Sequence, residues 1–406
     1  MYITRHLEAA VRHGSDNFPV LLLSGPRQVG KSTVLRQLGD SEREYVTLDD
    51  PFQRDMAQNR PQDFLASHRP PVTIDEIQYA PQLFPYLKMA VDDDCADGAY
   101  WITGSQVFPL MKGVTESLAG RVAVLRLGGL TGREEYGLAS HELATNHGEL
   151  AQSLPEPVVR QKLSQSRFGR ILRGQFPRSV THPDLSAELF FSSYIQTWLE
   201  RDVYQQLNLR SESTFLQFVR LLAARTGQEL NKGALAAALQ VDTKTVTSWL
   251  SVLESSGLVY LLPAWARNLG KRVVKRPKVY FLDTGLVCYL CGITSEAALQ
   301  NSPISGAIYE TWVVGEILRS WWNQGLREHV FYYRDQSQKE IDLILEIGET
   351  ILPLEIKVSS TPHAPFKNFE VLAPVAARVP YWGCICTVDA PTSVGDNAWL
   401  LPDTCL

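Results

Sequence analysis

Several features are scarce in this sequence, and each absence excludes a class of protein. The chain has only six Cys and four Met in 406 residues. No apolar run approaches the roughly 18 residues that a membrane-spanning helix needs, and the first one, Phe18 to Leu23, is too short for a signal peptide. We therefore expect a cytoplasmic protein that does not enter a membrane. Its cysteines, including the pair Cys288 and Cys291, are expected to be reduced core residues.

An excess of basic charge is also absent. The 39 Lys and Arg residues face 44 Asp and Glu residues, and the net charge of −5 excludes a histone-like protein that binds nucleic acid by bulk charge. A hydrophobic content of 45% with ordinary numbers of Gly (27) and Pro (23) excludes a disordered or collagen-like chain. At roughly 100–200 residues per domain, the length predicts two to four domains.

Three regions with different patterns follow one another along the chain. Residues 18–130 alternate short apolar runs with amphipathic segments, which predicts a parallel sheet covered by helices on both faces. The next hundred residues are helical in pattern, and strand-like runs return after Leu258. We predict an α/β domain over 1–140, a helical lid and winged-helix module over 141–265, and a mixed α/β domain over 266–406.

The strongest motif is Gly25-Pro-Arg-Gln-Val-Gly30-Lys31-Ser32, which fits G-x-x-x-x-G-K-[ST] between an apolar strand and a helix. The glycines let backbone N–H groups wrap phosphates at a helix N-terminus, where Lys31 can reach the β/γ-phosphates and Ser32 can ligate Mg²⁺. We predict that ATP is bound by the residues of this loop, which are Gly25, Pro26, Arg27, Gln28, Val29, Gly30, Lys31, Ser32 and Thr33.

Two further strand ends supply candidate catalytic residues. Asp75 can hold Mg²⁺ through water, and the adjacent Glu76 can orient or deprotonate the attacking water. Ser105 or Gln106, after another strand, can sense the γ-phosphate. Arg121 could stabilise transition-state charge on a neighbouring subunit's nucleotide. An acidic pair beside a phosphate-binding loop predicts hydrolysis rather than nucleotide binding alone.

Together the runs GPRQVGKST, TIDEIQ, ITGSQ and SLAGR resemble the AAA+ ATPase domain of a large prokaryotic family in which this domain is followed by the domain of unknown function DUF4143. The second half is similar too, in WLERDVYQ, KRVVKRPKVYFLDTGL and residues 333–357. The resemblance implies Mg-ATP hydrolysis and a homo-oligomer, with a hexameric ring as one form.

The middle of the chain predicts a winged helix. Residues 228–262 read as helix, turn, helix and strand, with Lys244 and Thr245 facing outward where a recognition helix meets a major groove. The stretch 267–278 has six basic residues and no acid, as a DNA-binding wing would; the ones expected to contact DNA are Lys271, Arg272, Lys275 and Arg276. A second basic stretch spans 160–178. The alternative is a helical lid that contacts protein and has a solvated wing.

The C-terminal region carries a D…E-x-K pattern. A turn at Gly348-Glu349 places Asp342 opposite Glu355, and a divalent cation between these carboxylates would offset their repulsion. With Lys357 on the same face, the pattern resembles the PD-(D/E)XK nuclease fold. That resemblance implies a further acid from the preceding helix, Glu310, and metal-assisted phosphodiester hydrolysis. The alternative is a surface ion pair between Glu340 and Lys357, with Asp342 solvated at a sheet edge.

The expected fold class is therefore α/β: a P-loop AAA+ domain with a parallel sheet, a helical and winged-helix module, and a mixed α/β nuclease-like domain. The expected function is Mg-ATP hydrolysis coupled to structure-selective action on DNA, by translocation or by remodelling that includes branched junctions. An ATP-gated metal-dependent nuclease and a regulatory NTPase switch that binds protein partners are the alternatives. The expected metal ligands are Ser32, Asp75, Glu310, Asp342 and Glu355.

Overall fold

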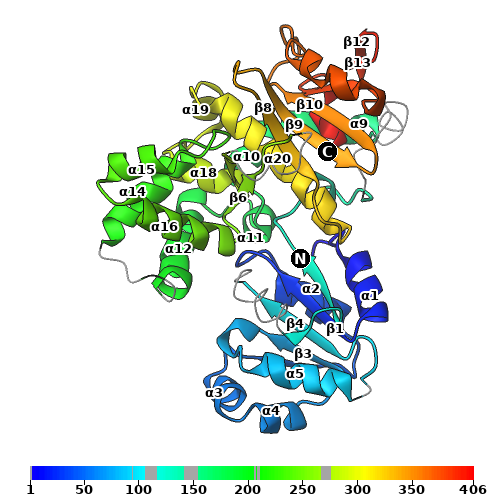
Figure 1. Cartoon of the computed structure of the whole chain (residues 1–406), viewed down its shortest axis with the longest axis vertical. Coiled ribbons are helices and arrows are strands. Elements are labelled where there is room, and N and C mark those ends of the chain that lie inside the picture. The colour runs from blue at the N-terminus through cyan, green and yellow to red at the C-terminus, as the bar shows by residue number, and fades with distance from the viewer. Residues whose placement is uncertain are drawn as a thin grey trace.

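The computed structural model describes residues 2–93, 95–105, 117–140, 154–204, 207, 211–266 and 276–406. Figure 1 shows a lower α/β domain in blue and cyan, a helical module in green on the left, and an upper domain in orange and red. A parallel sheet in the first domain and a mixed sheet in the last confirm the predicted fold class.

The N-terminal sheet has five parallel strands in the order β2-β3-β4-β1-β5. Its strands are β1 (Val20–Ser24), β2 (Glu44–Thr47), β3 (Val72–Asp75), β4 (Tyr100–Gly104) and β5 (Val122–Arg126). The helical segments of this domain are α1 (Glu8–Asn17), α2 (Lys31–Leu38), α3 (Pro51–Asn59), α4 (Pro61–Ser67), η1 (Ile77–Tyr79), α5 (Leu83–Asp92) and α7 (Gly132–Glu135). Every residue of the three central strands is buried, as in sheets covered on both faces. Because parallel strands end at the same edge, the ends of β1, β3 and β4 lie together.

The middle of the chain is helical as predicted. It contains α9 (Pro157–Gln165), α10 (Arg167–Arg173), α11 (Pro177–Thr181), α12 (Ala187–Trp198), the π-helical turn η2 (Leu199–Val203), α14 (Glu212–Ala223), α15 (Lys232–Leu239), α16 (Thr243–Ser255) and the hairpin of β6 (Val259–Leu262) with β7 (Lys278–Phe281). The β6–β7 pairing crosses the boundary predicted at 265/266, because β7 completes the wing of the helix-turn-helix rather than joining the C-terminal sheet.

The C-terminal sheet has six strands in the order β12-β13-β11-β10-β9-β8. Its elements, with the helices before it, are α18 (Thr284–Leu290), α19 (Glu296–Gln300), α20 (Ser305–Asn323), β8 (Val330–Arg334), β9 (Glu340–Ile347), β10 (Thr350–Ile356), η3 (Phe369–Arg378), β11 (Trp382–Cys386), β12 (Thr392–Gly395), β13 (Ala398–Pro402) and η4 (Asp403–Cys405). The β9–β10 hairpin turns at Gly348-Glu349 in the predicted register, which pairs Leu343 with Leu354.

The three parts share a continuous interior. One apolar cluster runs from Leu23 in β1 through Phe191 in α12 to Leu343 in β9. The long helix α20, in yellow, descends from the upper domain towards the lower one (Figure 1). At its C-terminal end Asn323 is buried, and its amide lies 3.5 Å from Glu134 of the ATPase domain. The ATPase domain is therefore packed against the C-terminal half of the chain through α20.

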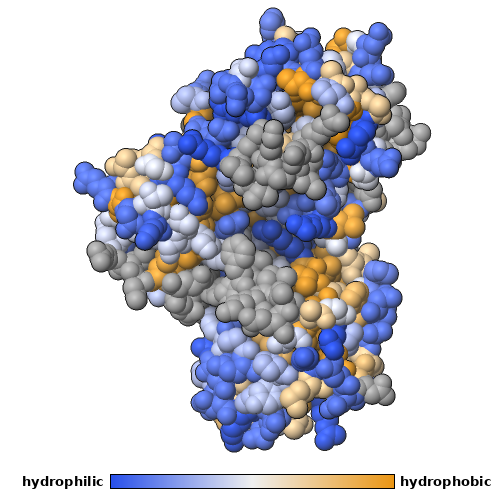
Figure 2. All heavy atoms as spheres, in the orientation of Figure 1, coloured by the Kyte–Doolittle hydropathy of each residue, from blue (hydrophilic) through white to orange (hydrophobic). Residues whose placement is uncertain are grey.

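No helix among the residues described above is long and apolar enough to cross a membrane. On the face in Figure 2, apolar residues are mostly interspersed with hydrophilic ones over the lower domain. Large exposed apolar side chains such as Phe52 and Met89 come from different helices, α3 and α5. Single exposed apolar residues of this kind are ordinary on globular proteins.

Candidate functional site

The loop from Gly25 to Lys31 connects β1 to α2 at the carboxyl edge of the parallel sheet. Gly25 has φ 149°, and a Cβ there would lie 2.1 Å from the Leu127 carbonyl oxygen, so only glycine fits. Gly30 precedes α2 with φ 94°, and a Cβ built on it would meet nothing within 4 Å. The loop therefore leaves open space at the N-terminus of α2, where N–H groups and the helix dipole favour an anion.

Lys31 lies inside this loop. Its ammonium donates to the carbonyl oxygens of Gly25, 2.9 Å, and Pro26, 2.8 Å, and the residue is buried. These contacts hold the lysine across the mouth of the loop, where an incoming phosphate would be within reach of the same ammonium.

Asp75 at the end of β3 is the centre of a hydrogen-bond network. It accepts from the Ser32 hydroxyl, with both carboxylate oxygens at 3.0 Å, and from Tyr45 at 2.5 Å. Thr103 of β4 also donates to it. Burial and the bond to Asp75 raise the pKa of Tyr45 to about 12, so the phenol stays a donor at neutral pH. The predicted Mg²⁺ ligands Ser32 and Asp75 are thus brought together.

Glu76 follows with the left-handed φ of 60°, which turns its side chain away from Asp75. Its carboxylate accepts from the Gln78 amide, which lies 3.3 Å from the Ser105 hydroxyl. The predicted water-activating residue and the predicted sensor are therefore linked through Gln78, which the sequence analysis left without a role. Gln106 lies outside the described residues.

An open pocket of about 560 Å³ lies over the phosphate-binding loop and reaches Glu76. The residues that line it are Arg27, Gln28, Gly30, Lys31, Ser32, Thr33, Glu76, Pro177, Arg178 and Thr197. Arg178 was noted in the sequence only as the last residue of the basic stretch 160–178, and it lies on α11 beside the phosphate-binding loop. A lone Arg some 145 residues after the loop gives no local sequence signal for such a position.

Arg121 is not brought to this pocket. It precedes β5 at the opposite edge of the sheet, next to Val20 at the start of β1, and its guanidinium pairs with Asp92 at 2.6 Å on the surface. Arg121 therefore lies at the edge of the sheet away from the phosphate-binding loop of the same chain, in a surface ion pair.

The residues present fit ATP and Mg²⁺. The glycine loop leaves a cradle at the start of α2, and Ser32 and Asp75 supply the oxygen ligands that Mg²⁺ prefers. When bound, the ion would neutralise phosphate charge. Lys31 would hold the terminal phosphates, and Glu76 would orient the attacking water.

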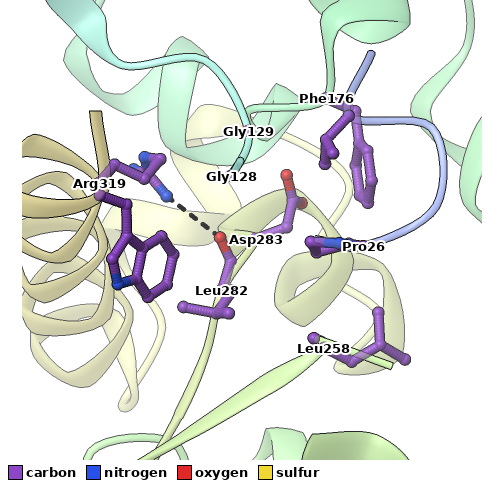
Figure 3. Close-up of a pocket in the computed structure, with 11 residues that line it drawn as sticks. Pro26, Gly128, Gly129, Phe176, Leu258, Leu282, Asp283 and Arg319 are labelled. Carbon is purple, nitrogen blue, oxygen red and sulfur yellow. Dashed lines mark hydrogen bonds between the residues drawn. The ribbon is translucent and has the colours of Figure 1, made fainter. Parts of the chain in front are cut away.

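The phosphate-binding loop also contacts the winged helix. In Figure 3, Pro26 lies between Phe176 of the helical module and Leu258 at the start of the wing. On the far side of this small pocket, Arg319 of α20 donates to the Leu282 carbonyl oxygen at 3.2 Å. Loop, wing and α20 therefore meet at one junction.

The helix-turn-helix is built as predicted. Asp242 caps α16 by accepting from the Thr245 N–H at 2.6 Å, and Val246, Leu250 and Leu253 are buried. Lys244 is exposed and Thr245 half-buried at the start of this helix. Arg276 is exposed just before β7, whereas Lys271, Arg272 and Lys275 lie outside the described residues.

The central arginines of the basic stretch 160–178 are paired within the chain. Arg167 forms a two-pronged pair with buried Asp403, and Arg170 and Arg173 both pair with Glu135. These guanidinium groups join the helical module to the ATPase domain and to the C-terminus. They are paired with carboxylates because each is half-buried or buried, where an unpaired charge would be costly.

A second cluster of ionisable groups surrounds the β9–β10 hairpin. Asp342 and Glu355 lie on one face, and the Lys357 ammonium is 3.6 Å from the first and 2.7 Å from the second. Burial and the charge of Asp342 raise the pKa of Glu355 to about 7. The predicted alternative of a surface Glu340–Lys357 pair is wrong, because Asp342 is buried and Glu340 pairs with Lys278 at 2.6 Å.

Lys278 is the residue that sequence reasoning misplaced here. It was counted with the basic wing, but its side chain is only 3% exposed and also lies 3.2 Å from Glu310. Tyr280 donates to the same Glu310 oxygen at 2.5 Å. Burial alone would lower the pKa of Lys278, but the neighbouring acidic groups hold it well above its ordinary value. In the strand sequence KVYF, side chains alternate with a period of two, so Lys278 and Tyr280 lie on the same face. This alternation was the sequence signal that could have predicted their shared contact.

The fit of a divalent ion at this cluster is partial. Oxygen Oε2 of Glu355 is buried without a hydrogen-bond partner, so a cation beside Asp342 would satisfy it. Among the residues that the structure describes, however, no group of three or more His, Cys, Asp or Glu side chains is arranged to hold an ion. Glu310, predicted as a metal ligand, already contacts Lys278 and Tyr280.

Three family descriptions match the chain in succession. Residues 17–136 match an AAA domain, residues 165–297 match the domain of unknown function DUF8612, and residues 305–406 match the domain of unknown function DUF4143. Among solved structures, the chain is similar to the Walker-type ATPase PABY2304 of Pyrococcus abyssi, with 16% identity and a TM-score of 0.41 over 71% of this chain and 96% of that one.

Two mycobacterial proteins are closer in sequence. The uncharacterized proteins Rv2008c of Mycobacterium tuberculosis and Mb2031c of Mycobacterium bovis are each 33% identical over 361 residues, which is 88% of this chain and 74% of theirs. The AAA and DUF4143 matches fall at the two ends of the chain, as the motifs predicted. This chain therefore belongs to the family of P-loop ATPases in which an AAA domain is followed by a C-terminal DUF4143 domain.

Proposed function

We propose that this protein hydrolyses ATP with Mg²⁺ and uses the cycle to move or remodel DNA, with a preference for particular DNA structures, including branched junctions. The observation that carries the proposal is the contact of the phosphate-binding loop with the helix-turn-helix. Pro26 packs on Gly257, in the turn that follows α16. A movement of the loop between nucleotide states would therefore be transmitted directly to α16, which presents Lys244 at its exposed start.

Each catalytic role has a candidate in or beside the pocket. Lys31 binds the terminal phosphates, and Ser32 and Asp75 hold Mg²⁺. Glu76 activates water, and its carboxylate is held by the Gln78 amide, which also donates to the Ser105 hydroxyl. All of these side chains lie where β1, β3 and β4 end, at the carboxyl edge of the parallel sheet.

The decisive test is ATP turnover measured with single-stranded, duplex and branched DNA. We expect DNA of the preferred structure to raise turnover several-fold, and Lys244→Glu to abolish that increase while the DNA-free rate is unchanged. Lys88→Glu, on the exposed side of α5, is the matched charge reversal and should keep the increase. Turnover that is indifferent to every DNA would contradict the proposal. A partner protein that changes the rate instead would favour the regulatory switch.

We further propose a homo-oligomer, with a hexameric ring as one form, in which Arg121 acts on the neighbour's nucleotide. Its place at the edge of the sheet opposite the phosphate-binding loop supports a role between copies. Arg121→Ala and Lys31→Ala chains should each be inactive alone. Mixed together, they should regain turnover, because an intact loop then faces an intact arginine. No recovery in co-assembled mixtures would argue against a shared site.

A metal-dependent DNA nuclease is the second candidate function. It is favoured by one observation, the buried and unpartnered Oε2 of Glu355 opposite Asp342, with Lys357 beside both. Such an activity should require Mg²⁺ or Mn²⁺ and disappear in Asp342→Ala and Lys357→Ala. DNA that remains uncut by the wild-type chain under ATP turnover would eliminate this candidate without affecting the ATPase proposal.

A further inference from the structure

The carboxylate cluster of the C-terminal domain contains a cation that belongs to another part of the chain. Lys278 comes from β7, the second strand of the wing, and its side chain is 3% exposed. Its ammonium lies 2.6 Å from Glu340, 3.2 Å from Glu310 and 3.9 Å from Asp342. Three carboxylates from two elements of the C-terminal domain thus converge on one ammonium of the wing.

The two lysines of the cluster occupy different positions. Lys357 is 43% exposed and faces Asp342 and Glu355 from the solvent side. Lys278 is enclosed, with its ammonium 5.5 Å from the centre of the Tyr332 ring and with buried Tyr280 donating to the same oxygen of Glu310. Lys278 is therefore built into the interior, whereas the side with Lys357 is open.

Carboxylates that are largely removed from solvent need a counter-charge, and an ion or a fixed ammonium can supply it. For Glu310 and Glu340 that charge is already present in Lys278. Arg334 adds a second one for Glu340 at 3.6 Å. Among the residues that the structure describes, the carboxylate oxygen of this cluster that is fully buried without a hydrogen-bond partner is Oε2 of Glu355. The buried, unsatisfied coordination thus lies on the Asp342–Glu355 side, whereas Oε1 of Glu310 is already bonded to Lys278 and Tyr280.

We propose that Lys278 is a resident cation that takes the place of a metal ion at Glu310 and Glu340. Only Asp342 and Glu355 then remain for an added divalent ion. Lys278 is a positioning residue in this account, since it holds two carboxylates and locks the wing strand onto the nuclease-like sheet. The inference goes beyond the ATPase proposed above and holds whether or not the cluster cuts DNA.

The test uses the nucleotide-free full chain, with Mn²⁺ as the probe. Binding is measured by calorimetry, and the melting temperature is recorded with and without Mn²⁺. Lys278→Met should melt several degrees below the wild type without metal and recover in Mn²⁺. Its Mn²⁺ affinity should be at least tenfold higher than that of the wild type, and a further Asp342→Asn change should remove that gain, which separates it from any Mn²⁺ at Ser32 and Asp75.

Two variants show whether charge is the cause. Lys278→Arg keeps the cation and should behave as the wild type does towards Mn²⁺. Glu310→Gln in the wild-type background should change Mn²⁺ affinity less than twofold, because Glu310 is not a ligand. If Lys278→Met does not fold in either condition, Lys278→Met with Glu310→Gln removes one charge of each sign and should recover the fold.

The inference is overturned by any of three results. The first is a Lys278→Met chain that folds and binds Mn²⁺ no better than the wild type. The second is a Glu310→Gln chain that loses at least tenfold in Mn²⁺ affinity. The third is a double variant as unstable as Lys278→Met alone, which would mean that Lys278 acts by packing rather than by charge.

Discussion

The ring of Pro26 in the phosphate-binding loop lies directly on Gly257 at the turn between α16 and β6. A Cβ added to Gly257 would come within 2.8 Å of the Pro26 Cγ atom. Gly257 also has φ 69°, a conformation that side chains disfavour. The nucleotide loop and the helix-turn-helix, which are more than 200 residues apart in the sequence, are therefore in contact without an intervening side chain.

Gly257→Ala should weaken both stability and nucleotide binding. The positive φ costs about 1 kcal/mol and the forced movement of Pro26 about 1–3 kcal/mol more. Chemical denaturation and a fluorescent ATP analogue measure the two effects. Gly292→Ala is the matched control, with φ 71° and nothing within 4 Å of an added Cβ. Equal losses in the two variants would show that the contact with Pro26 contributes nothing.

Glu76→Gln should reduce ATP turnover at least about 100-fold, the range for loss of a general base. Nucleotide affinity should stay within about threefold, because the amide keeps the place beside Gln78 and leaves Ser32 and Asp75 intact. Phosphate release and nucleotide titration check the two quantities. The exposed Glu42→Gln of the same domain should change neither. Turnover above a tenth of the wild-type rate would assign water activation to another residue.

Arg167→Ala should be among the most destabilising single substitutions of a charged residue. Among the residues that the structure describes, it leaves the nearly buried Asp403 carboxylate with the Tyr309 hydroxyl, 2.8 Å away, as its side-chain partner, at a cost of about 3–5 kcal/mol. Arg121→Ala removes the same type of pair, with Asp92, at the surface and should cost about 0–1 kcal/mol. Urea denaturation compares them. Similar losses would contradict the structural role assigned to the Arg167–Asp403 pair.

Acid should destabilise the wild type through Glu134. Burial alone would raise the pKa of this carboxyl, but the charge of Arg5 at 3.0 Å and the N–H groups of Thr131 and His6 hold it below its usual 4.5. The ionised Glu134 carboxylate therefore stabilises the folded state above pH 4.5. This stabilisation is lost as the pH falls through the pKa of Glu134 in the folded state, which is lower than its pKa in the unfolded state.

The free energy of unfolding, measured between pH 3 and pH 7, tests this sign. Glu134→Gln should be less stable than the wild type at neutral pH, and the difference should shrink as the pH falls below about 4.5. If the difference in the free energy of unfolding between the wild type and Glu134→Gln stays constant with pH, Glu134 acts only through its packing.

Local patterns were sufficient for the elements themselves. The run Val20–Ser24 followed by glycines predicts a buried strand and a phosphate-binding loop. Both features depend on residues that are adjacent in the sequence: a short apolar run forms the strand, and glycines allow the positive φ angles of the loop. The register that sets Asp342 opposite Glu355 follows likewise from a two-residue turn and a period of two. Both are determined within a few residues of the chain, so the sequence alone could give them.

Only the tertiary structure decided which charges meet. Lys278 reads as part of a basic wing, and Arg167 as part of a basic stretch, yet each is buried against carboxylates of distant elements. Arg178 reads as the end of the same basic stretch, yet it lines the pocket at the phosphate-binding loop. The physical reason is that a charge pattern along the chain does not specify burial, and the cost of burying a charge is offset by whichever partner the packing of helices and strands brings to it.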